Sequence, residues 1–293
     1  MPEGPSIVIL REQVERFAGC PIVRAEGNAK IDMSRITGRR VAAFRSWGKY
    51  FLVDLHGLAL RVHFMMFGSY AIDERKPRAP RLSLGFNSGE LNLYSCAIRL
   101  IEGDLDDVYD WSADVMSDAW NPRAAGRKLR AMPEALVCDA LLDQQVFAGV
   151  GNIIKNEVLY RIRVHPLSTV GSLSPAKRRQ LVREARQYSF DFLNWKKQFV
   201  LREHWLVHNR GTCGGCGRKL TRAYLGERDR RTFICEHEQR LYGTAAQARR
   251  AATVLAGARK GGTKTAARAP PTIERGHRGS PRSTARRVRP RIR

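Results

Sequence analysis

The stretch QQVFAGVGNIIKNEVLY, residues 144–160, joins two helix-like segments through the glycine-containing connector 149–151. Apolar side chains recur at helical spacing in residues 133–149 and again in residues 152–164, and the connector interrupts that pattern. The N–H groups and the positive dipole end of a helix that begins at Asn152 would suit a phosphate. A connector that binds nothing is the ordinary alternative. The stretch therefore predicts a helical region with a candidate anion site.

The helical region continues downstream. Ser174 is a favoured N-cap residue and Pro175 a favoured first helical residue, so a long helix is expected to begin there and to run to about Trp195. Upstream, the character changes near Trp120, where β-rich runs give way to NPRAAGRKL. Residues 121–205 are therefore expected to form a mostly helical domain.

Residues 1–120 predict a different architecture. Apolar side chains at spacings of three, four and three residues predict an amphipathic helix over residues 5–18. Apolar, β-rich runs follow, separated by turn residues at Gly57 and at 87–89. These runs are VAAFRSWGKYFLVDL, LALRVHFMMFGSYAI, RLSLGF and LNLYSCAIRLI. They indicate an antiparallel sandwich or barrel.

Six cysteines are distributed as three scattered residues and three that gather late in the chain, which is typical of a reducing compartment and one metal site. Thiolates and a neutral imidazole suit tetrahedral Zn²⁺, and four protein ligands would make that zinc structural. Glu238 stands where a fourth cysteine commonly falls and is the alternative to the histidine. The candidate ligands, from CGGC and CEH, are Cys213, Cys216, Cys235 and His237.

The charge points to a polyanionic partner. Lys and Arg number 52 against 28 Asp and Glu, a formal net charge of +24. An anionic membrane is disfavoured because no apolar run of membrane-spanning length, secretory signal or lipidation motif is present. Residues 243–293 hold 14 Lys or Arg, one acidic residue and almost no large apolar residue. They are expected to be disordered, because they cannot bury enough surface to offset chain entropy.

The first residues, MPEGPS, raise a chemical question. Removal of Met1 would leave Pro2 as a free N-terminal secondary amine, with Glu3 as the first carboxylate beside it. Considered alone, the pattern is better explained as a start residue followed by turn-forming residues. Motifs elsewhere in the chain are needed to distinguish the two interpretations.

Four unlike motifs, in order over residues 1 to about 242, resemble the formamidopyrimidine-DNA glycosylase and endonuclease VIII family. They are MPEGP, SWGKYFL, QQVFAGVGNIIKNEVLY, and VHNRGTCGGCG with RRTFIC. The resemblance implies an α+β multidomain fold with four parts, and DNA held in the cleft between domains. The parts are an N-terminal β-sandwich with its helix (1–120), a helix-two-turn-helix domain (121–205), a zinc-finger hairpin (206–242) and the basic tail (243–293).

The resemblance also answers the question about the first residues. It implies that Pro2 attacks C1′ of a damaged nucleotide flipped out of the duplex, and that Glu3 is the general acid-base. Lys49 matches a lysine that contacts phosphate and assists catalysis. Asn152 matches an asparagine that holds a backbone phosphate. Arg230 matches the zinc-finger arginine that clamps phosphates, and the adjacent Arg231 could exchange roles with it.

An extruded base leaves a gap in the stack of bases, and an apolar side chain can fill that gap. The resemblance implies that Met65, Met66 and Phe67 do so, and these residues are expected to lie in a turn. The alternative is an apolar strand of the core. Gly4 and the absence of a motif like DPRRFG resemble the endonuclease VIII side, which implies oxidised pyrimidines as substrates. Ser6 departs from the second Glu that many relatives carry, which puts in doubt any support from that carboxylate.

The sequence therefore predicts a bifunctional DNA glycosylase and abasic-site lyase that cleaves by β- or β,δ-elimination. It is expected to be a monomer with one structural zinc, no small-molecule cofactor, damaged DNA as its partner and no membrane. A zinc-containing protein that binds damaged or bent DNA without cutting it is the alternative, and an RNA-binding protein is supported by the basic tail alone. The expected location is the bacterial cytoplasm, or the nucleus in a eukaryote.

Overall fold

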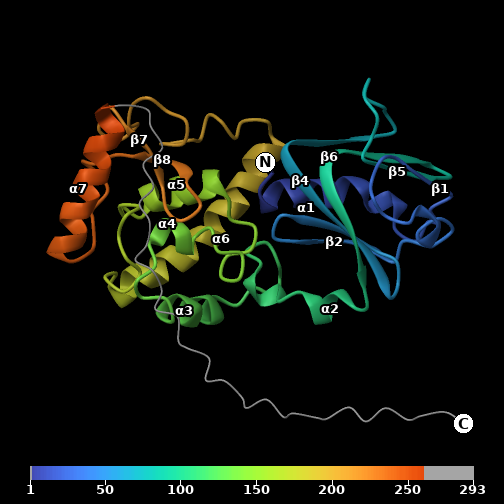
Figure 1. Ribbon diagram of the computed structural model, residues 1–293, viewed down its shortest axis with the longest axis horizontal. Helices are drawn as coiled ribbons and strands as arrows, with labels where there is room; N and C mark the ends of the chain where they lie inside the picture. Colours follow the sequence, from blue (N-terminus) through green and yellow to red (C-terminus); the bar gives the residue numbers. More distant parts are fainter. Residues whose placement is uncertain (1, 261–293) are drawn as a thin grey trace, which may run out of the picture.

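A six-stranded antiparallel sheet forms the N-terminal part of the chain in the computed structural model, which describes residues 2–260 (Figure 1). The strand order is β1-β5-β6-β4-β3-β2. The strands are β1 (Arg24–Glu26), β2 (Ala43–Trp47), β3 (Tyr50–Asp54), β4 (Leu58–Ile72), β5 (Leu82–Phe86) and β6 (Gly89–Glu102). The four apolar runs picked out in the sequence are therefore strands, and β1 is the one that the pattern missed.

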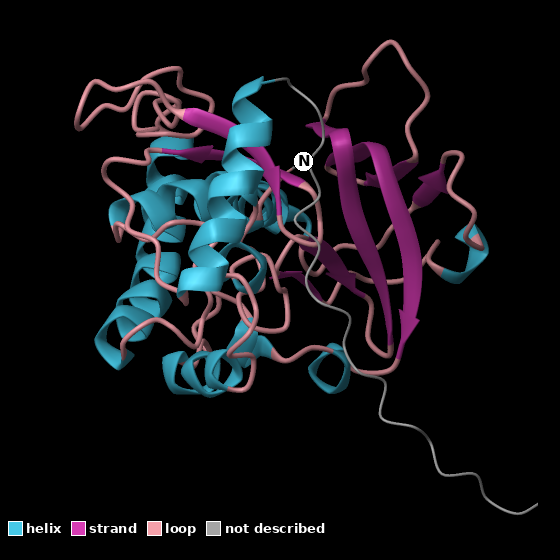
Figure 2. Cartoon of the chain, turned by 60° about the vertical axis from the view of Figure 1, so that its left-hand side comes forward, coloured by secondary structure: helices cyan, strands magenta, loops and turns pink. Residues whose placement is uncertain are grey.

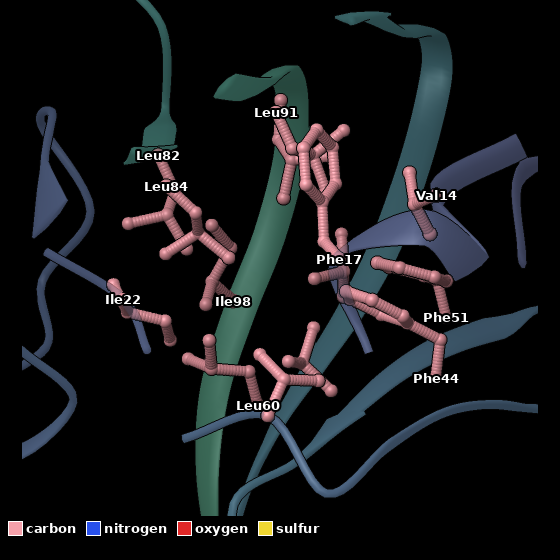
Figure 3. Close-up of a cluster of buried hydrophobic side chains, with 14 of the residues drawn as sticks. Val14, Phe17, Ile22, Phe44, Phe51, Leu60, Leu82, Leu84, Leu91 and Ile98 are labelled. Carbon is pink, nitrogen blue, oxygen red and sulfur yellow. The ribbon is translucent and has the colours of Figure 1, made fainter. Parts of the chain in front are cut away.

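The predicted sandwich takes the form of one continuous sheet, because the long strands β4 and β6 belong to both of its halves. Side chains from β2 to β6 converge with those of helix α1 (Gly4–Val14) on a single core, and Ala25 of β1 packs against its edge (Figure 3). Phe17, in the short 3-10 helix Glu15–Phe17, stacks on Phe86 with ring centroids 4.4 Å apart. Helix α1 also packs against the long helix of the second domain, so it lies between the two domains.

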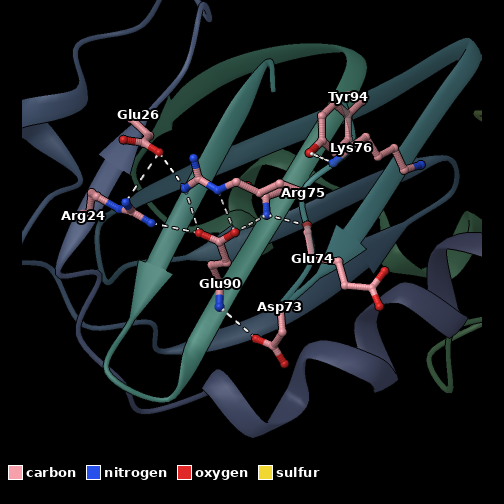
Figure 4. Close-up of polar contacts among 9 residues, drawn as sticks. Arg24, Glu26, Asp73, Glu74, Arg75, Lys76, Glu90 and Tyr94 are labelled. Atoms are coloured by element: carbon pink, nitrogen blue, oxygen red, sulfur yellow. Dashed lines mark hydrogen bonds and ion pairs between the residues drawn. The ribbon is translucent and has the colours of Figure 1, made fainter. Parts of the chain in front are cut away.

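Tight turns join neighbouring strands, and charged side chains pair on the surface of the sheet. The predicted hairpin turns are confirmed at 55–57, between β3 and β4, and at 87–88, between β5 and β6. Figure 4 shows Arg75, in the segment after β4, donating to Glu90 at 2.8 Å and to Glu26 at 2.7 Å. The hydrogen bonds from Arg75 lower the pKa of Glu90 to about 2. Ion pairs this exposed add little stability, so the network mainly holds that segment against β1 and β6.

Helices make up the middle of the chain, and most of them gather on one side of the molecule, with the large sheet on the other (Figure 2). They are α3 (Pro122–Arg130), α4 (Val137–Ala140), α5 (Asn152–Arg161) and α6 (Pro175–Lys197), preceded by a 3-10 turn at Trp111–Ala113. The short α2 (Leu105–Val108) packs against the sheet, and a further 3-10 turn, Met33–Arg35, lies between β1 and β2. Ser174 caps α6 as predicted, since its hydroxyl accepts from the Lys177 N–H at 3.2 Å.

The helix predicted over 133–149 is wrong, because only α4 is helical there. The Asp143 carboxylate accepts from the Gln145 N–H at 2.8 Å and its carbonyl from the Phe147 N–H at 2.8 Å. Such side-chain bonds to nearby backbone compete with helix formation. The apolar residues of this segment are buried in the core of the helical domain although most of them lie in turns. Their spacing in the sequence therefore resembled that of an amphipathic helix.

The C-terminal part is a hairpin of β7 (Thr221–Leu225) and β8 (Arg230–Ile234), followed by helix α7 (Ala245–Lys260). The disorder expected from residue 243 is therefore wrong for 245–260, and residues 261–293 lie outside the described residues. Ala251 and Leu255 of α7 are buried in a cluster with Leu225 and Ile234 of the hairpin. Their spacing of four residues forms one apolar helix face, a signal that the high charge of the segment obscured.

Within residues 2–260, no helix combines the length and the apolar character needed to cross a membrane.

Candidate active site and metal centre

The carboxylate of Glu3 is buried at the N-terminus of α5, about 150 residues further along the chain. The N–H groups of Gly151, Ile153 and Ile154 donate to its oxygens at 3.1, 2.7 and 3.2 Å. Burial raises the pKa of the Glu3 carboxyl, and the Lys49 ammonium and the three N–H groups oppose that rise. A carboxyl held in this way has a fixed position and can hold a proton at higher pH than an exposed one.

Close backbone contact at this point depends on glycines. A Cβ at Gly151 would lie 2.3 Å from Cδ of Glu3, and one at Gly4 would lie 2.9 Å from Cα of Gly149. The Gly4 N–H donates to the Gly149 carbonyl at 2.9 Å. Three N–H groups at this helix terminus thus bind the chain's own Glu3 carboxylate, so a phosphate near the start of α5 would be held by the Asn152 side chain and not by these N–H groups.

Lys49 occupies the two-residue turn between β2 and β3, where Trp47 pairs with Tyr50. Gly48, the first residue of that turn, has a φ of +56°, which tight hairpin turns require and glycine adopts readily. The Gly48 N–H donates to Oδ2 of Asp114 at 2.9 Å. The turn that carries Lys49 is therefore fastened to the chain that links the sheet to the helices.

Charges of both signs shift the pKa of Lys49. Burial lowers its pKa, the nearby Arg228 and Arg230 lower it further, and Glu3 opposes them. Arg230 opens β8, and Arg228 lies in the turn before it. Glu3, Arg228 and Arg230 therefore lie near enough to Lys49 for their charges to shift its pKa, and Arg228 is a residue that sequence reasoning missed.

The two candidate arginines of the hairpin differ in surroundings. The Arg231 guanidinium lies 5.8 Å from the centre of the Tyr224 ring and donates to its hydroxyl at 3.2 Å. The charge of Arg230, in contrast, acts on Lys49. The side chain of Asn152 donates to the Arg231 carbonyl at 2.8 Å. Asn152 therefore ties the start of α5 to the hairpin in this structure.

A cavity of about 750 Å³ opens beside this cluster. Pro2, Glu3 and Ser6 are among its lining residues. The other lining residues are Ile7 of α1, Ile153 of α5, and residues of β4, of the end of α6 and of the loop that follows it. Its size lies in the range of small-molecule sites, roughly 300–1,000 Å³.

Met65, Met66 and Phe67 are exposed to 52%, 68% and 80%, so they do not belong to the core. They lie in β4 itself rather than in a hairpin turn. Phe64 pairs with Cys96 and Ser69 with Tyr94, so four residues of β4 stand opposite a single residue of β6. This register shift is a large bulge that projects the three apolar side chains outward.

The sulfur atoms of Cys213, Cys216 and Cys235 lie within 4.8 Å of one another, and Cys216 is equally close to donor atoms of His237 and Glu238. Tetrahedral ligands about 2.3 Å from a zinc ion would lie roughly 3.8 Å apart, so the donors fit a metal ion. Among the described residues these two overlapping groups form a candidate metal site with three thiolates and one further ligand.

The carboxylate of Glu238 is already engaged, because it accepts a hydrogen bond from Arg163. His237 is exposed, and its Nδ1 lies 3.5 Å from the Glu238 carboxylate. The sequence favours His237 over Glu238, because a carboxylate oxygen is a harder ligand than an imidazole nitrogen. Their surroundings leave the imidazole the freer of the two.

Sequence reasoning also missed a buried lysine. Lys155 is fully buried and its ammonium donates to the Thr232 hydroxyl at 2.7 Å, which in turn donates to the Arg230 carbonyl at 2.9 Å. Burial lowers the pKa of Lys155 to about 8. The sequence signal that could have shown it was the apolar sequence on both sides of the three polar residues 155–157. A helix with apolar residues on each side of such a run is buried around its circumference, so its polar side chains need partners inside the protein.

Two family models match the chain. The formamidopyrimidine-DNA glycosylase N-terminal domain matches residues 1–99, and the formamidopyrimidine-DNA glycosylase H2TH domain matches residues 112–188. Among solved structures, the Lactococcus lactis formamidopyrimidine DNA glycosylase bound to DNA with an abasic site aligns with a TM-score of 0.71. It is 20% identical and covers 81% of this chain and 99% of its own. A viral DNA glycosylase aligns with the same TM-score at 21% identity, covering 81% and 100%. These likenesses establish the fold.

Curated relatives are more similar in sequence. Endonuclease 8-like 3 of Xenopus laevis is 31% identical over 76% of this chain and 38% of its own length. Endonuclease 8-like 2 of Homo sapiens is 34% identical over 61% and 57%. Formamidopyrimidine-DNA glycosylase of Carboxydothermus hydrogenoformans is 29% identical over 64% and 75%. The chain spans less than half the length of the endonuclease 8-like 3 proteins that it matches. With the fold, the two domain matches and these identities together, the chain belongs to the formamidopyrimidine-DNA glycosylase and endonuclease VIII family, on its endonuclease 8-like side.

Proposed function

We propose that this protein removes oxidised bases from DNA and then cuts the strand at the resulting abasic site. One observation carries the proposal: Pro2 and the buried Glu3 line one cavity, Lys49 lies near enough to Glu3 for their charges to interact, and Arg228 and Arg230 act in the same way on Lys49. A nucleophile, a proton carrier and phosphate-binding charges are the groups that this chemistry requires.

In the proposed reaction Met1 has been removed, and the secondary amine of Pro2 bonds to C1′ of the extruded nucleotide. The bond from C1′ to the base breaks, and the base leaves with a proton. Glu3 supplies the proton that opens the sugar ring, which its raised pKa favours. The iminium ion is cationic and acidifies the hydrogen on C2′. Loss of that proton expels the 3′ phosphate by β-elimination, and a second elimination can release the 5′ phosphate.

Binding to DNA rests on charge and on the bulge in β4. Lys49, Asn152 and Arg230 are proposed to contact backbone phosphates around the damaged nucleotide, where guanidinium groups suit bidentate contacts. The exposed residues 65–67 are proposed to enter the stack where the base has left it. The net charge of +24 adds sequence-independent, salt-sensitive affinity. One chain carries all of these groups, so we propose that it acts as a monomer.

The proposed metal is a single structural Zn²⁺ bound by Cys213, Cys216, Cys235 and His237. His237 is preferred over Glu238 because the latter already pairs with Arg163. When bound, the ion would cross-link the two ends of the hairpin segment. The hairpin residues then hold Arg228 and Arg230 opposite Lys49.

Oxidised pyrimidines, such as thymine glycol or hydroxylated cytosines, are the proposed substrates. The stretch LYSCAIRLIEG stands where the purine-specific side of the family usually has a motif like DPRRFG. Three consecutive apolar residues in the β4 bulge take the place of wedge residues from that motif.

Borohydride trapping tests the proposal. The protein is prepared with an N-terminal extension, and half of it is cleaved so that Pro2 becomes the first residue. After incubation with an oligonucleotide that carries an abasic site, reduction should yield a covalent adduct with the cleaved form only, and much less with Pro2→Gly. Equal adducts from both forms would indicate a lysine nucleophile. Tight binding to abasic DNA with no adduct from either form would instead favour a protein that binds damage without cutting it.

A further inference from the structure

Lys155 is a fully buried lysine that the proposed reaction does not use. Burial of an ammonium group is unfavourable unless hydrogen bonds replace its contacts with water. An apolar side chain of similar length, such as methionine, would fill the same space without that penalty. The hydrogen-bond partners of Lys155 indicate what its charged group holds in place.

The hydrogen bonds of Lys155 lead to the residue that opens β8. Its ammonium donates to the Thr232 hydroxyl at 2.7 Å, and that hydroxyl donates to the Arg230 carbonyl at 2.9 Å. The first of these bonds has a charged donor, so it is stronger than a bond between neutral groups. Thr232 is fully buried as well, so water cannot replace that bond. Lys155 thus fixes the backbone from which the Arg230 side chain extends.

Two neighbouring side chains of α5 hold β8 in the same way, and Figure 1 shows the strand beside that helix. The side chain of Asn156 accepts from the Phe233 N–H at 3.1 Å. That of Asn152 donates to the Arg231 carbonyl at 2.8 Å. Residues 152, 155 and 156 are spaced by three and four, so they share one face of α5. A two-stranded hairpin is only marginally stable on its own, so the position of β8 depends on this face.

The same helix also holds the proposed proton carrier, because N–H groups of its first turn bind the Glu3 carboxylate. Burial is the main cause that lowers the pKa of Lys155 to about 8. The charge of Glu3 opposes that shift and the charge of Arg230 adds to it, so both groups lie near enough to interact with the ammonium. One helix thus fixes the carboxyl and the strand that carries Arg230 relative to each other.

We propose that Lys155 is a positioning residue for Arg230. Through Thr232 it fixes the start of β8, so that the Arg230 guanidinium meets a backbone phosphate beside the nucleotide on which Glu3 acts. Lys155 itself does not touch DNA, because it is fully buried. This inference rests on the proposed function, since it requires Arg230 to bind a phosphate.

The test uses Lys155→Met and Thr232→Val in the full chain, each with Arg230 intact and each combined with Arg230→Gln. Valine suits a strand and keeps the shape of threonine but lacks the hydroxyl. The ligand is a duplex in which tetrahydrofuran replaces one deoxyribose, so that no iminium ion can form with Pro2. Its affinity is measured between about 50 and 200 mM salt.

With Arg230 intact, each variant should bind about 10-fold more weakly, the usual effect of a lost hydrogen bond to a charged group. The slope of log affinity against log salt should become shallower by about 0.9, the value for one lost phosphate contact. With Arg230→Gln present, the same two changes should weaken binding less than about twofold, because the contact that they support is already gone.

Thr221→Val is the matched control. It removes a hydroxyl from the neighbouring strand β7 that donates to the Glu236 carboxylate, so the affinity and the salt slope should stay unchanged. Equal weakening by Lys155→Met in both Arg230 backgrounds would overturn the inference, because Lys155 would then act independently of Arg230. A lower unfolding free energy with an unchanged salt slope would also overturn it, since the role would be structural only. Failure of the unaltered protein to cut an abasic duplex would overturn the proposed function instead.

Discussion

The chain buries charged side chains in one region and exposes apolar side chains in another, and residues of both regions line the same cavity. The buried polar junction consists of Glu3, Asp114 and Lys155, which are exposed to 4% or less. The apolar rim consists of Met65, Met66, Phe67 and Phe199, which are exposed to more than half. Each reverses the usual distribution of polar and apolar side chains.

The two regions differ in whether their side chains have hydrogen-bond partners within the protein. Glu3 accepts three hydrogen bonds, Asp114 accepts two and Lys155 donates one within the protein, so every charge of the junction has a partner. The rim projects its side chains into solvent instead. We infer that changes in the junction affect both stability and catalysis, whereas changes in the rim affect substrates and leave stability nearly unchanged.

The largest expected effect comes from Gly151→Ala in the junction. The new Cβ would lie 2.3 Å from Cδ of Glu3, so the carboxyl must leave its place at the start of α5. We expect base removal to fall about 10²-fold to 10⁴-fold, the usual contribution of a general acid-base. Gly126→Ala in α3 is the matched control, because its Cβ meets nothing closer than 3.9 Å. Full activity of Gly151→Ala in single-turnover assays would show that Glu3 is not the proton carrier.

A second effect concerns the dependence of stability on pH. Burial lowers the pKa of Lys155 to about 8, from about 10.4 in an unfolded chain. Between these values the unfolded chain binds more protons, so the unfolding free energy should rise with pH, by about 3 kcal/mol at most. Lys155→Met should remove that rise. Urea titrations of both proteins at pH 8, 9 and 10 measure it, and parallel curves would mean that the lysine is not titrating in the fold.

The smallest effect on stability is expected in the rim. Phe67→Ser removes a ring that is 80% exposed, so the unfolding free energy should change by less than about 0.5 kcal/mol. Cutting of duplex DNA with an abasic site should nevertheless fall about tenfold, since a stacked aromatic contributes roughly 1–3 kcal/mol. The same lesion in single-stranded DNA should be cut at the original rate. A destabilised Phe67→Ser would place the ring in the core and end the contrast between the two regions.

Local patterns predicted the elements of the fold well. The apolar runs became β2 to β6, and Ser174 and Pro175 begin α6 as expected. The two wrong predictions, a helix over 133–149 and disorder from residue 243, also have local causes. Apolar residues in turns stabilised by Asp143 are spaced as in a helix, and the many charges of 243–260 obscured the apolar face of α7.

The candidate site was predictable to the extent that it lies in short motifs. Pro2 and Glu3 line one cavity, Glu3 and Arg230 lie near enough to Lys49 to shift its pKa, and the three cysteines form one cluster. The contacts that position them were not predictable. Glu3 meets α5 across about 150 residues, and Lys155 meets Thr232 across 77. No local pattern encodes such pairings, because they form only when separate domains pack together.

The contact between Glu3 and α5 has a consequence for synthesis on the ribosome. The first residues emerge early, but the backbone that holds the carboxyl follows about 150 residues later. At about 5–20 residues per second, that delay lasts roughly 8–30 s. A nascent or prematurely terminated chain would carry the reactive amine without its proton carrier in place. The protein would therefore be unable to damage nucleic acid until most of it has been translated.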